Sequence, residues 1–251
     1  MKHYPFILFY LFCNAFIYAF QASMWVYVFC FLLFCFVVAW GSFDIQLGYF
    51  VNSITHKRTK MKEVALTFDD GPTEFTPRFL DLLKEHDVKA TFFCIGKQIE
   101  QYPETFRRIV DEGHSIGNHT LSHARNTGFL SAPEMVKEIE ACDDIMSGTA
   151  NVKTSLYRPP FGVTNPNIAK AIKKTGKISI GWNVRSLDTV TENEKKIYRK
   201  VTKGLKKGSI ILFHDTSEKT YNVLVDLLLF LKEQKYSAFT VDSMIKSKTN
   251  D

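Results

Sequence analysis

The sequence predicts an α/β fold, a barrel of seven β/α units that follows an N-terminal membrane segment. Three observations lead to this prediction. Residues 4–43 contain no Asp, Glu, Lys, Arg or His. From Val64 onward, short β-branched or aromatic runs alternate with amphipathic stretches, as expected when crossover helices join parallel strands. Seven such units in about 190 residues indicate a barrel smaller than the usual one of eight units. A doubly wound open sheet has the same local pattern and remains the alternative.

The uncharged N-terminal run is too long for one straight membrane span. A helix over residues 4–43 would measure about 60 Å, twice the thickness of the hydrocarbon core of a bilayer. Two segments, 6–20 and 24–40, divided at Gln21-Ala22-Ser23, match the bilayer better, although the first is short for a span. We therefore interpret residues 1–43 as a hydrophobic membrane segment with one or two transmembrane helices in contact with membrane lipid.

Basic residues on both sides of this segment leave its orientation open. Lys2 precedes it, and Lys57, Arg58, Lys60 and Lys62 follow it. Under the positive-inside rule, a hairpin of two helices would place both ends in the cytosol, whereas a single span would place the rest of the chain outside. We expect a protein anchored in the cell membrane, with the extracytoplasmic side favoured for its domain.

The rest of the chain is long enough for one domain with a sizeable core. We divide it into a linker, 44–61, and a domain, 62–251. Cys94 and Cys142 are the only cysteines after the membrane segment, and both lie in apolar patterns typical of core residues rather than of a disulfide. The chain has 32 Lys+Arg against 26 Asp+Glu, a net charge of +6, and no recognised nucleic-acid motif, so we expect no nucleic-acid partner. The sequence does not specify an oligomeric state.

Each predicted strand is a short apolar run, and each predicted helix has a marked start or face. The strands cover residues 63–68, 89–95, 114–118, 155–158, 178–183, 209–213 and 237–241. Pro77 stands at a first-turn position, and Pro133 follows Ser131 as at a helix start. One face of a later helix is formed by Leu224, Leu227, Leu228 and Leu231. The basic stretch 195–207 is interpreted as a solvated helix face, with Ile197, Val201 and Leu205 toward the core.

Polar residues follow two of these strands at their carboxyl ends, where barrels and open α/β sheets place their active sites. Asp69 and Asp70, in Thr-Phe-Asp-Asp-Gly-Pro, end the first strand, although an Asp-Gly turn alone would give the same pattern. His119 and His123 follow the third strand. Four residues apart, they fall on one side of a helical turn and can reach one metal ion. Two His and one carboxylate are the usual ligands of a hydrolytic zinc or related divalent site.

Three more segments end strands on the same rim. Arg158 precedes two prolines and Phe161, in Arg-Pro-Pro-Phe-Gly. The segment from Trp182 to Asp188 reads Trp-Asn-Val-Arg-Ser-Leu-Asp, and His214 lies in the run Ile-Ile-Leu-Phe-His-Asp. A rigid turn alone would explain the Arg158 segment. The His-Asp pair could be structural, yet its place on the same rim favours a role in proton transfer.

The five segments together resemble the polysaccharide deacetylases of the NodB-homology type, carbohydrate esterase family 4. The resemblance covers about residues 62–245 and is specific, because TFDDGP, HTLSH, RPPFG and LFHD occur in order in one chain. It implies a distorted (β/α)7 barrel, in agreement with the strand count. It also implies a metal-dependent hydrolase that releases acetate from an N-acetylglucosamine-type glycan, such as peptidoglycan, a chitooligosaccharide or an exopolysaccharide. The implied cofactor is one divalent ion, Zn²⁺ in the first place, with Co²⁺, Mn²⁺ or Ni²⁺ also accepted.

The resemblance implies a role for each matching residue. The implied metal ligands are Asp70, His119 and His123. Asp69 would be the general base, oriented by Arg158, and His214 would protonate the leaving amine while Asp188 keeps it charged. The implied substrate-binding groups are the backbone N–H of Phe161 at the oxyanion, Leu212 at the acetyl methyl, and Trp182 as further apolar surface.

The fourth segment departs from the commoner family pattern, which has Asp at the position of Arg185 and Trp at the position of Thr189. This departure affects the expected wall of the acetyl pocket and the preference among acyl groups or sugars. Every metal, base and acid position is filled, so the sequence predicts an active enzyme. Three alternatives remain: an esterase that removes O-acetyl groups from a polysaccharide, a deacylase of a lipid-linked sugar, and a catalytically idle glycan-binding barrel.

Overall fold

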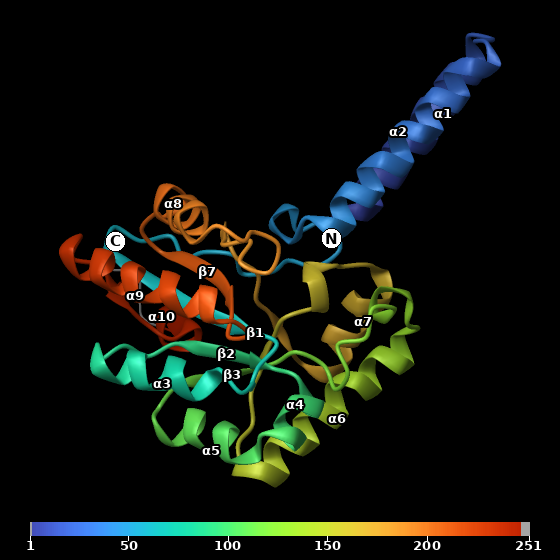
Figure 1. The fold of residues 1–251 in the computed structure, drawn as a ribbon. Coiled ribbons are helices and arrows are strands. Elements are labelled where there is room, and N and C mark those ends of the chain that lie inside the picture. Colours follow the sequence, from blue (N-terminus) through green and yellow to red (C-terminus); the bar gives the residue numbers. More distant parts are fainter. Residues whose placement is uncertain (1, 247–251) are drawn as a thin grey trace.

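A computed structural model describes residues 2–246; the outer ends of the predicted membrane segment and domain, residue 1 and residues 247–251, lie outside the described residues. The strands are β1 (Glu63–Asp69), β2 (Thr91–Cys94), β3 (Ser115–Asn118), β4 (Leu156–Tyr157), β5 (Ile178–Ser179), β6 (Val184–Arg185), β7 (Ser209–His214) and β8 (Ser237–Ala238). They form a parallel sheet in the order β5-β4-β3-β2-β1-β7-β6, with β8 beside the start of β1. The sheet curls into a half-barrel with helices around it (Figure 1), which confirms the predicted fold class.

The helices of the domain pack around this sheet. They are α3 (Thr76–Glu85), α4 (Gly96–Gln101), α5 (Pro103–Asp111), α6 (Ala132–Ala150), α7 (Pro166–Thr175), α8 (Glu194–Gly204), α9 (Glu218–Glu233) and α10 (Val241–Lys246), with short 3₁₀ turns η1 (Ile45–Leu47), η2 (Thr127–Phe129) and η3 (Pro160–Gly162). Most of the helices lie on the outer side of the sheet, whereas Val241 and Met244 of the last helix join the buried cluster on its inner side. The predicted starts are confirmed: Pro77 lies in the first turn of α3, and Ser131 forms a capping box with Glu134 at the start of α6. The leucine face predicted for α9 is buried.

The alternation of β1 explains how the core and the polar rim arise from one strand. Val64, Leu66 and Phe68 are fully buried in the outer core, between the sheet and helices such as α3 and α9. Ala65 belongs to a second buried cluster on the other face, and Thr67 and Asp69 follow it at intervals of two. The strand therefore directs Asp69 into the half-barrel. Cys94 and Cys142 are buried and free, which confirms that they are core residues.

The predicted strand 178–183 is wrong in extent, and β6 was not predicted. The chain leaves one edge of the sheet after β5 and reaches the other edge at β6: β5 pairs with β4, whereas β6 pairs with β7. Between them, the N–H of Gly181 donates to the carbonyl of Ile54. A continuous apolar run does not show where the chain changes its pairing partner, because the hydrophobic pattern does not specify which strand lies alongside.

The segment 44–61 packs against the domain and crosses the gap between the two sheet edges. Ile54 bridges Ile180 near β5, and His56 bridges Ser209 at the start of β7. The buried apolar side chains of this segment are Ile45, Tyr49, Phe50 and Val51. Experiments on the domain therefore require this segment, and the full chain is the appropriate material.

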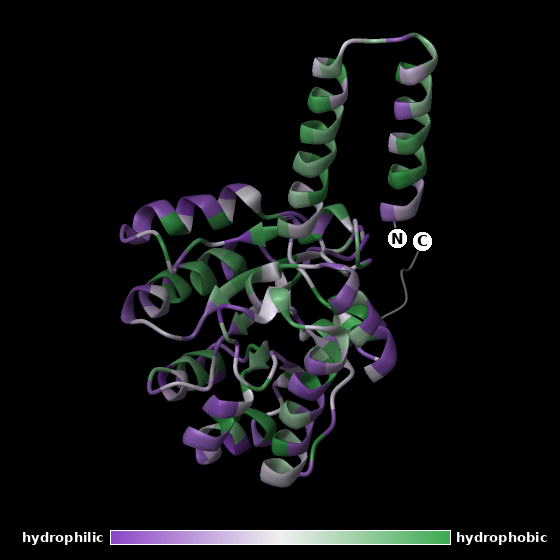
Figure 2. Cartoon of the chain, turned by 90° about the vertical axis from the view of Figure 1, so that its right-hand side faces the viewer, coloured by the Kyte–Doolittle hydropathy of each residue, from purple (hydrophilic) through white to green (hydrophobic). Residues whose placement is uncertain are grey.

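Two apolar helices, α1 (His3–Ala19) and α2 (Met24–Phe43), project from the domain as a hairpin. Figure 2 shows them side by side and mostly hydrophobic, and the predicted break at residues 21–23 is confirmed. Among the described helices, α2 is the one long and apolar enough to cross a membrane; α1 is apolar and has 17 residues. Lys2 at the start of α1 donates its backbone N–H to Tyr49, so both ends of the hairpin lie next to the domain.

Candidate active site

Strand register brings the separate motifs to one edge of the sheet. Asp69, at the end of β1, is in register with His214, at the end of β7. Asn118 of β3 is in register with Tyr157 of β4, so the residues that follow them, His119 and Arg158, are neighbours. The Nδ1–H of His119 donates to the backbone carbonyl of Arg158 at 2.7 Å. Parallel pairing alone therefore gathers four of the predicted site residues.

Asp69 is held by a fully buried arginine. Nη1 of Arg158 donates to Asp69 Oδ1 at 2.6 Å and to Thr67 Oγ1 at 2.8 Å, and its other nitrogens donate to backbone carbonyls of residues 180 and 181. The guanidinium carbon lies 4.0 Å from the centre of the Phe93 ring. Burial lowers the pKa of Arg158, and Asp69 opposes that effect. The second oxygen of Asp69 stays directed at the site, 3.7 Å from Nε2 of His119.

Asp70, His119 and His123 form a cluster whose ligand atoms all lie within 4.8 Å of one another. Oδ1 of Asp70 is 3.4 Å from Nε2 of His119 and 3.6 Å from Nε2 of His123. The expected helical turn between the two His is wrong: they flank an irregular loop in which Thr120 has a φ of 70° and His123 a φ of 47°. Asn118 Oδ1 accepts from Thr120 N–H, and Thr120 Oγ1 accepts from His123 N–H, so local hydrogen bonds stabilise this loop.

This donor set fits a divalent metal ion. Oδ1 of Asp70 is buried without a hydrogen-bond partner, although it lies between the two imidazoles. The contact from Nδ1 of His119 to a carbonyl leaves Nε2 of that ring unprotonated, as a ligand must be. Burial lowers the pKa of His123 to about 4 and keeps it neutral. Burial would raise the pKa of Asp70, but the surrounding imidazoles outweigh this and bring it well below its usual range.

His214 and Asp188 form a second buried pair on the other side of Asp70. Nδ1–H of His214 donates to Asp188 Oδ1 at 2.9 Å, and Nε2 of His214 points toward Asp70 Oδ2 at 3.9 Å. Burial lowers the pKa of His214, but Asp188 outweighs it and raises the pKa to about 9. Asp188 also accepts from the hydroxyls of Ser186 and Thr220. The contact with Asp188 therefore favours the protonated imidazolium of His214 at neutral pH.

Most of the predicted site residues line one cavity, and two of them lie behind its wall. A cavity of about 230 Å³ is lined by Asp69, Asp70, His119, His123, Phe161, Gly162, Trp182, Arg185, Thr189, Leu212 and His214. Arg158 and Asp188 lie behind this lining and are almost completely buried. Phe161 has a φ of 59° and is half exposed, with its ring 4.5 Å from that of His123. Gly162 lies so close to Trp182 that a Cβ there would meet the indole ring at 2.5 Å.

Sequence reasoning missed several supporting residues. Thr67 could have been found, because it precedes Asp69 by two positions and so shares its face of β1. Thr220 gives no such signal, because it reaches Asp188 from the first turn of α9. Asp215 is fully buried, which raises its pKa to about 7, and it accepts from the hydroxyl of Thr76. These contacts tie the end of β7 to the loop that follows β1.

Comparison with known proteins identifies the family. The model of the polysaccharide deacetylase family matches residues 56–178. The peptidoglycan-N-acetylmuramic acid deacetylase PdaA of Bacillus subtilis is 33% identical over 195 residues, which are 76% of this chain and 74% of that protein. The chain belongs to the polysaccharide deacetylase family. The structure of the Bc1960 peptidoglycan N-acetylglucosamine deacetylase shares its fold with a TM-score of 0.73 and 34% identity, over 79% of this chain and 95% of that one.

Another member of the polysaccharide deacetylase family is similar over a shorter part. A peptidoglycan-N-acetylglucosamine deacetylase of Bacillus cereus is 40% identical over 155 residues, which are 61% of this chain. The chain spans 56% of the length of that relative.

Proposed function

We propose that this chain is a metal-dependent deacetylase that hydrolyses the N-acetyl groups of an N-acetylglucosamine-type glycan to free amine and acetate. The observation that carries the proposal is the cluster of Asp70, His119 and His123 with an ionisable group on each side of it. Asp69 lies 3.7 Å from His119, and His214 lies 3.9 Å from Asp70. The names of the relatives, which act on peptidoglycan sugars, support the substrate class.

In this proposal, Asp70, His119 and His123 hold the metal, and the remaining groups move protons. A divalent ion in such a site acidifies water and polarises the carbonyl of the scissile amide. Asp69 takes the proton from the attacking water, and Arg158 keeps its carboxylate oriented toward the cavity through the 2.6 Å contact. The backbone N–H of Phe161 stabilises the oxyanion that forms on the former carbonyl oxygen.

His214 completes the reaction as the general acid. Collapse of the tetrahedral intermediate breaks the C–N bond, and the amine nitrogen takes the proton from Nε2 of His214. Asp188 accepts from Nδ1–H of the same ring at 2.9 Å, which favours the charged imidazolium before this step. Leu212 and Trp182 line the cavity and supply apolar surface for the acetyl methyl group.

The test is acetate release by the full chain in mild detergent, measured with metal, after chelation, and after the metal is returned. We expect Zn²⁺ or Co²⁺ to restore release from an N-acetylglucosamine oligomer or a peptidoglycan fragment, with the chelated protein at least about 100-fold slower because the Lewis acid is absent. Acetylated xylan serves as the O-ester comparison.

The other outcomes of this test separate the rival functions. Release from xylan alone would identify an O-acetyl esterase and contradict the proposal. Metal binding without release from any of these glycans would contradict it as well, and would support either an idle barrel or a deacylase of a lipid-linked sugar. A lipid-linked N-acetylated sugar separates these two functions: a deacylase would release the acyl group from it as free acid, and an idle barrel would not.

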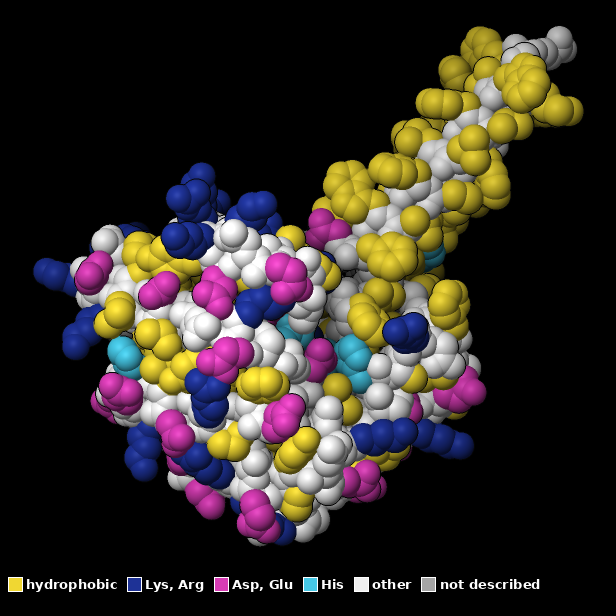
Figure 3. All heavy atoms as spheres, viewed as in Figure 1, with side chains coloured by type: hydrophobic (Ala, Val, Ile, Leu, Met, Phe, Trp, Pro, Cys, Tyr) yellow, Lys and Arg dark blue, Asp and Glu magenta, His cyan; other side chains and the backbone are white. Residues whose placement is uncertain are grey.

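The proposal includes an anchor in the cell membrane, with the domain on the extracytoplasmic side. Large apolar side chains on α1 and α2 are exposed, among them Phe12, Trp25 and Phe36, and Figure 3 shows the hairpin covered by them. An apolar surface of this extent is typical of a membrane segment. Both ends of the hairpin lie next to the domain, so a hairpin in the bilayer leaves the N-terminal end and the domain on one side. The positive-inside rule taken alone would place both ends of such a hairpin in the cytosol. The peptidoglycan substrates named for the relatives support the outer side instead, and the proposal follows them.

We expect the full chain to sediment with membranes after a carbonate wash, and an impermeant amine reagent added to intact cells to label the lysines of α8. Leu33→Arg, in the middle of α2, should release the protein because a charge in the hydrocarbon region is costly. Lys203→Arg, on the exposed face of α8, is the control that should not. Recovery of the unsubstituted protein in the soluble fraction would contradict the anchor, and protection of α8 in intact cells would contradict the orientation.

A further inference from the structure

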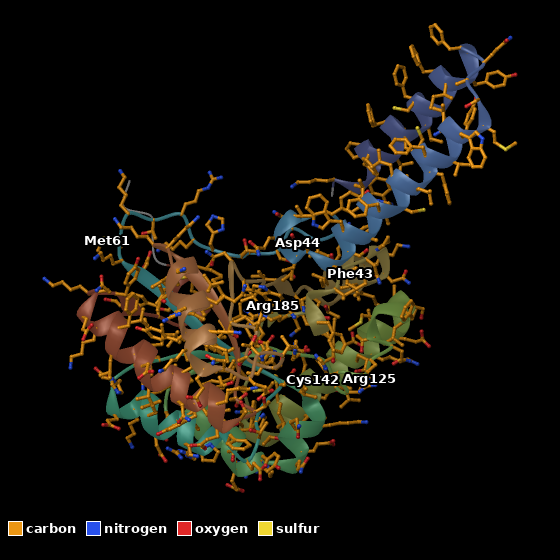
Figure 4. The ribbon with its side chains drawn as sticks, turned by 45° about the horizontal axis from the view of Figure 1, so that its top comes forward. Phe43, Asp44, Met61, Arg125, Cys142 and Arg185 are labelled. Atoms are coloured by element: carbon orange, nitrogen blue, oxygen red, sulfur yellow. The ribbon has the colours of Figure 1, made fainter. Side chains whose placement is uncertain are left out.

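Arg185 lines the cavity, but the proposed mechanism gives it no role. It ends β6, where it is in register with Leu212 of β7. Figure 4 shows it near the middle of the face that is turned forward in that view. Its side chain is exposed, and its guanidinium carbon lies 5.7 Å from the centre of the Trp182 ring, within the range of a cation–π contact. Trp182 therefore holds this cation at the wall of the cavity.

The other charged groups of the site have partners inside the protein. Asp69 is paired with Arg158, and Asp188 is paired with His214. Asp70 lies between the imidazoles of the metal cluster. Arg185, by contrast, makes no ion pair or side-chain hydrogen bond with any residue between 2 and 246. One cation at the substrate cavity thus has no counter-charge from the described part of the chain.

We propose that Arg185 binds a carboxylate of the substrate, so that the glycan on which this protein acts carries an acidic sugar at or next to the acetylated one. The inference rests on the proposed deacetylase function. A guanidinium presents two parallel N–H groups that match a carboxylate, and contact with an aromatic ring restricts its rotamers before the ligand binds. A neutral N-acetylglucosamine oligomer offers Arg185 no such partner.

The carboxylate has two chemical sources in acetylated glycans. In one, a lactyl ether on the acetylated sugar itself carries it, as in N-acetylmuramic acid. In the other, a uronic acid next to an N-acetylhexosamine carries it. Both place a carboxylate within a few bonds of the scissile amide, and both are recognised by the same guanidinium chemistry.

The test compares kcat and KM of the metal-loaded full chain on matched oligosaccharides. The substrates are a neutral N-acetylglucosamine tetramer, an alternating N-acetylglucosamine–N-acetylmuramic acid tetramer with free lactyl carboxylates, the same tetramer with these carboxylates converted to methylamides, and a tetramer that alternates uronic acid with N-acetylhexosamine. The variants are Arg185→Gln and Arg185→Lys. Arg199→Gln, on the exposed face of α8, is the control for loss of one positive charge.

We expect Arg185→Gln to raise KM about 10-fold or more for at least one carboxylate-bearing tetramer, with kcat retained, because a charge-assisted hydrogen bond is lost. The neutral and methylamide substrates should change less than about twofold, and Arg185→Lys should recover part of the KM effect. The tetramer that responds identifies the source of the carboxylate.

Two results would overturn this inference while leaving the proposed function intact. One is equal activity of wild type and Arg185→Gln on every tetramer. The other is an equal loss on charged and neutral tetramers, which would show that Arg185 supports the cavity wall. If the wild type releases acetate from none of the four tetramers, the proposed deacetylase function fails as well. Activity of the wild type therefore distinguishes failure of the Arg185 inference alone from failure of both proposals.

Discussion

Asp69→Asn is expected to lower kcat for acetate release by about 1,000-fold or more, because the substitution removes the carboxylate oxygen that is proposed to take the proton from water. The amide oxygen can still accept from Nη1 of Arg158, so the fold should be kept. Acetate release at saturating metal is the measurement, with metal content determined on the same samples.

Metal content separates the role of Asp69 from that of its neighbour. Asp69→Asn should retain the metal, whereas His119→Gln should lose most of it, because His119 supplies one of three protein ligands in the proposed site. Glu104→Gln, which weakens the exposed pair with Arg107 on α5, should behave like the wild type in both respects. Full hydrolytic activity of Asp69→Asn would show that the proton is taken by another group.

Arg158→Met is expected to lower the free energy of unfolding by about 3–5 kcal/mol, because it leaves Asp69 as a buried carboxylate without its counter-charge. Arg158 is completely buried and Asp69 nearly so, and no solvent replaces the lost contact. Met keeps most of the side-chain volume against Phe93. Urea unfolding of the full chain in mild detergent, followed by tryptophan fluorescence, measures the change.

A double-mutant cycle tests the cause. The double substitution Arg158→Met with Asp69→Asn removes both charges, so its loss of stability should be smaller than the sum of the two single losses. Additive losses would show that the hydrogen bonds of Arg158 to Thr67 and the backbone carry the stability, and not the ion pair. A stable Arg158→Met protein that is inactive would assign Arg158 to orientation of the base alone.

The elements and the candidate residues could be predicted because each depends on local sequence. The periodicity of β1 places Val64, Leu66 and Phe68 on one face and leaves Asp69 on the other. Pro77 and the Ser131–Glu134 box mark helix starts through the backbone groups at a helix end. The break between α1 and α2 follows from the polar residues Gln21 and Ser23.

Other features depend on pairing between distant segments, and local patterns do not contain that information. The predicted strand 178–183 ends early, at Ser179, because β5 joins β4 and the chain then crosses to β7, where Val184 and Arg185 form β6. The two imidazoles meet through a loop stabilised by Asn118 and Thr120, and the expected helical turn was wrong.

The sequence by itself determined which chemical groups this protein has, in which order, and at the ends of which strands. Only the tertiary structure decided their states. The register of β1 with β7 sets Asp69 beside His214. Burial lowers the pKa of His214, but the contact with Asp188 outweighs this and raises it to about 9. Folding also buries Arg158 against Asp69, whereas Arg185 stays exposed at the cavity without an acidic partner among the described residues. Charge pairing depends on distances of a few ångströms and on exclusion of water, and both are properties of the folded chain.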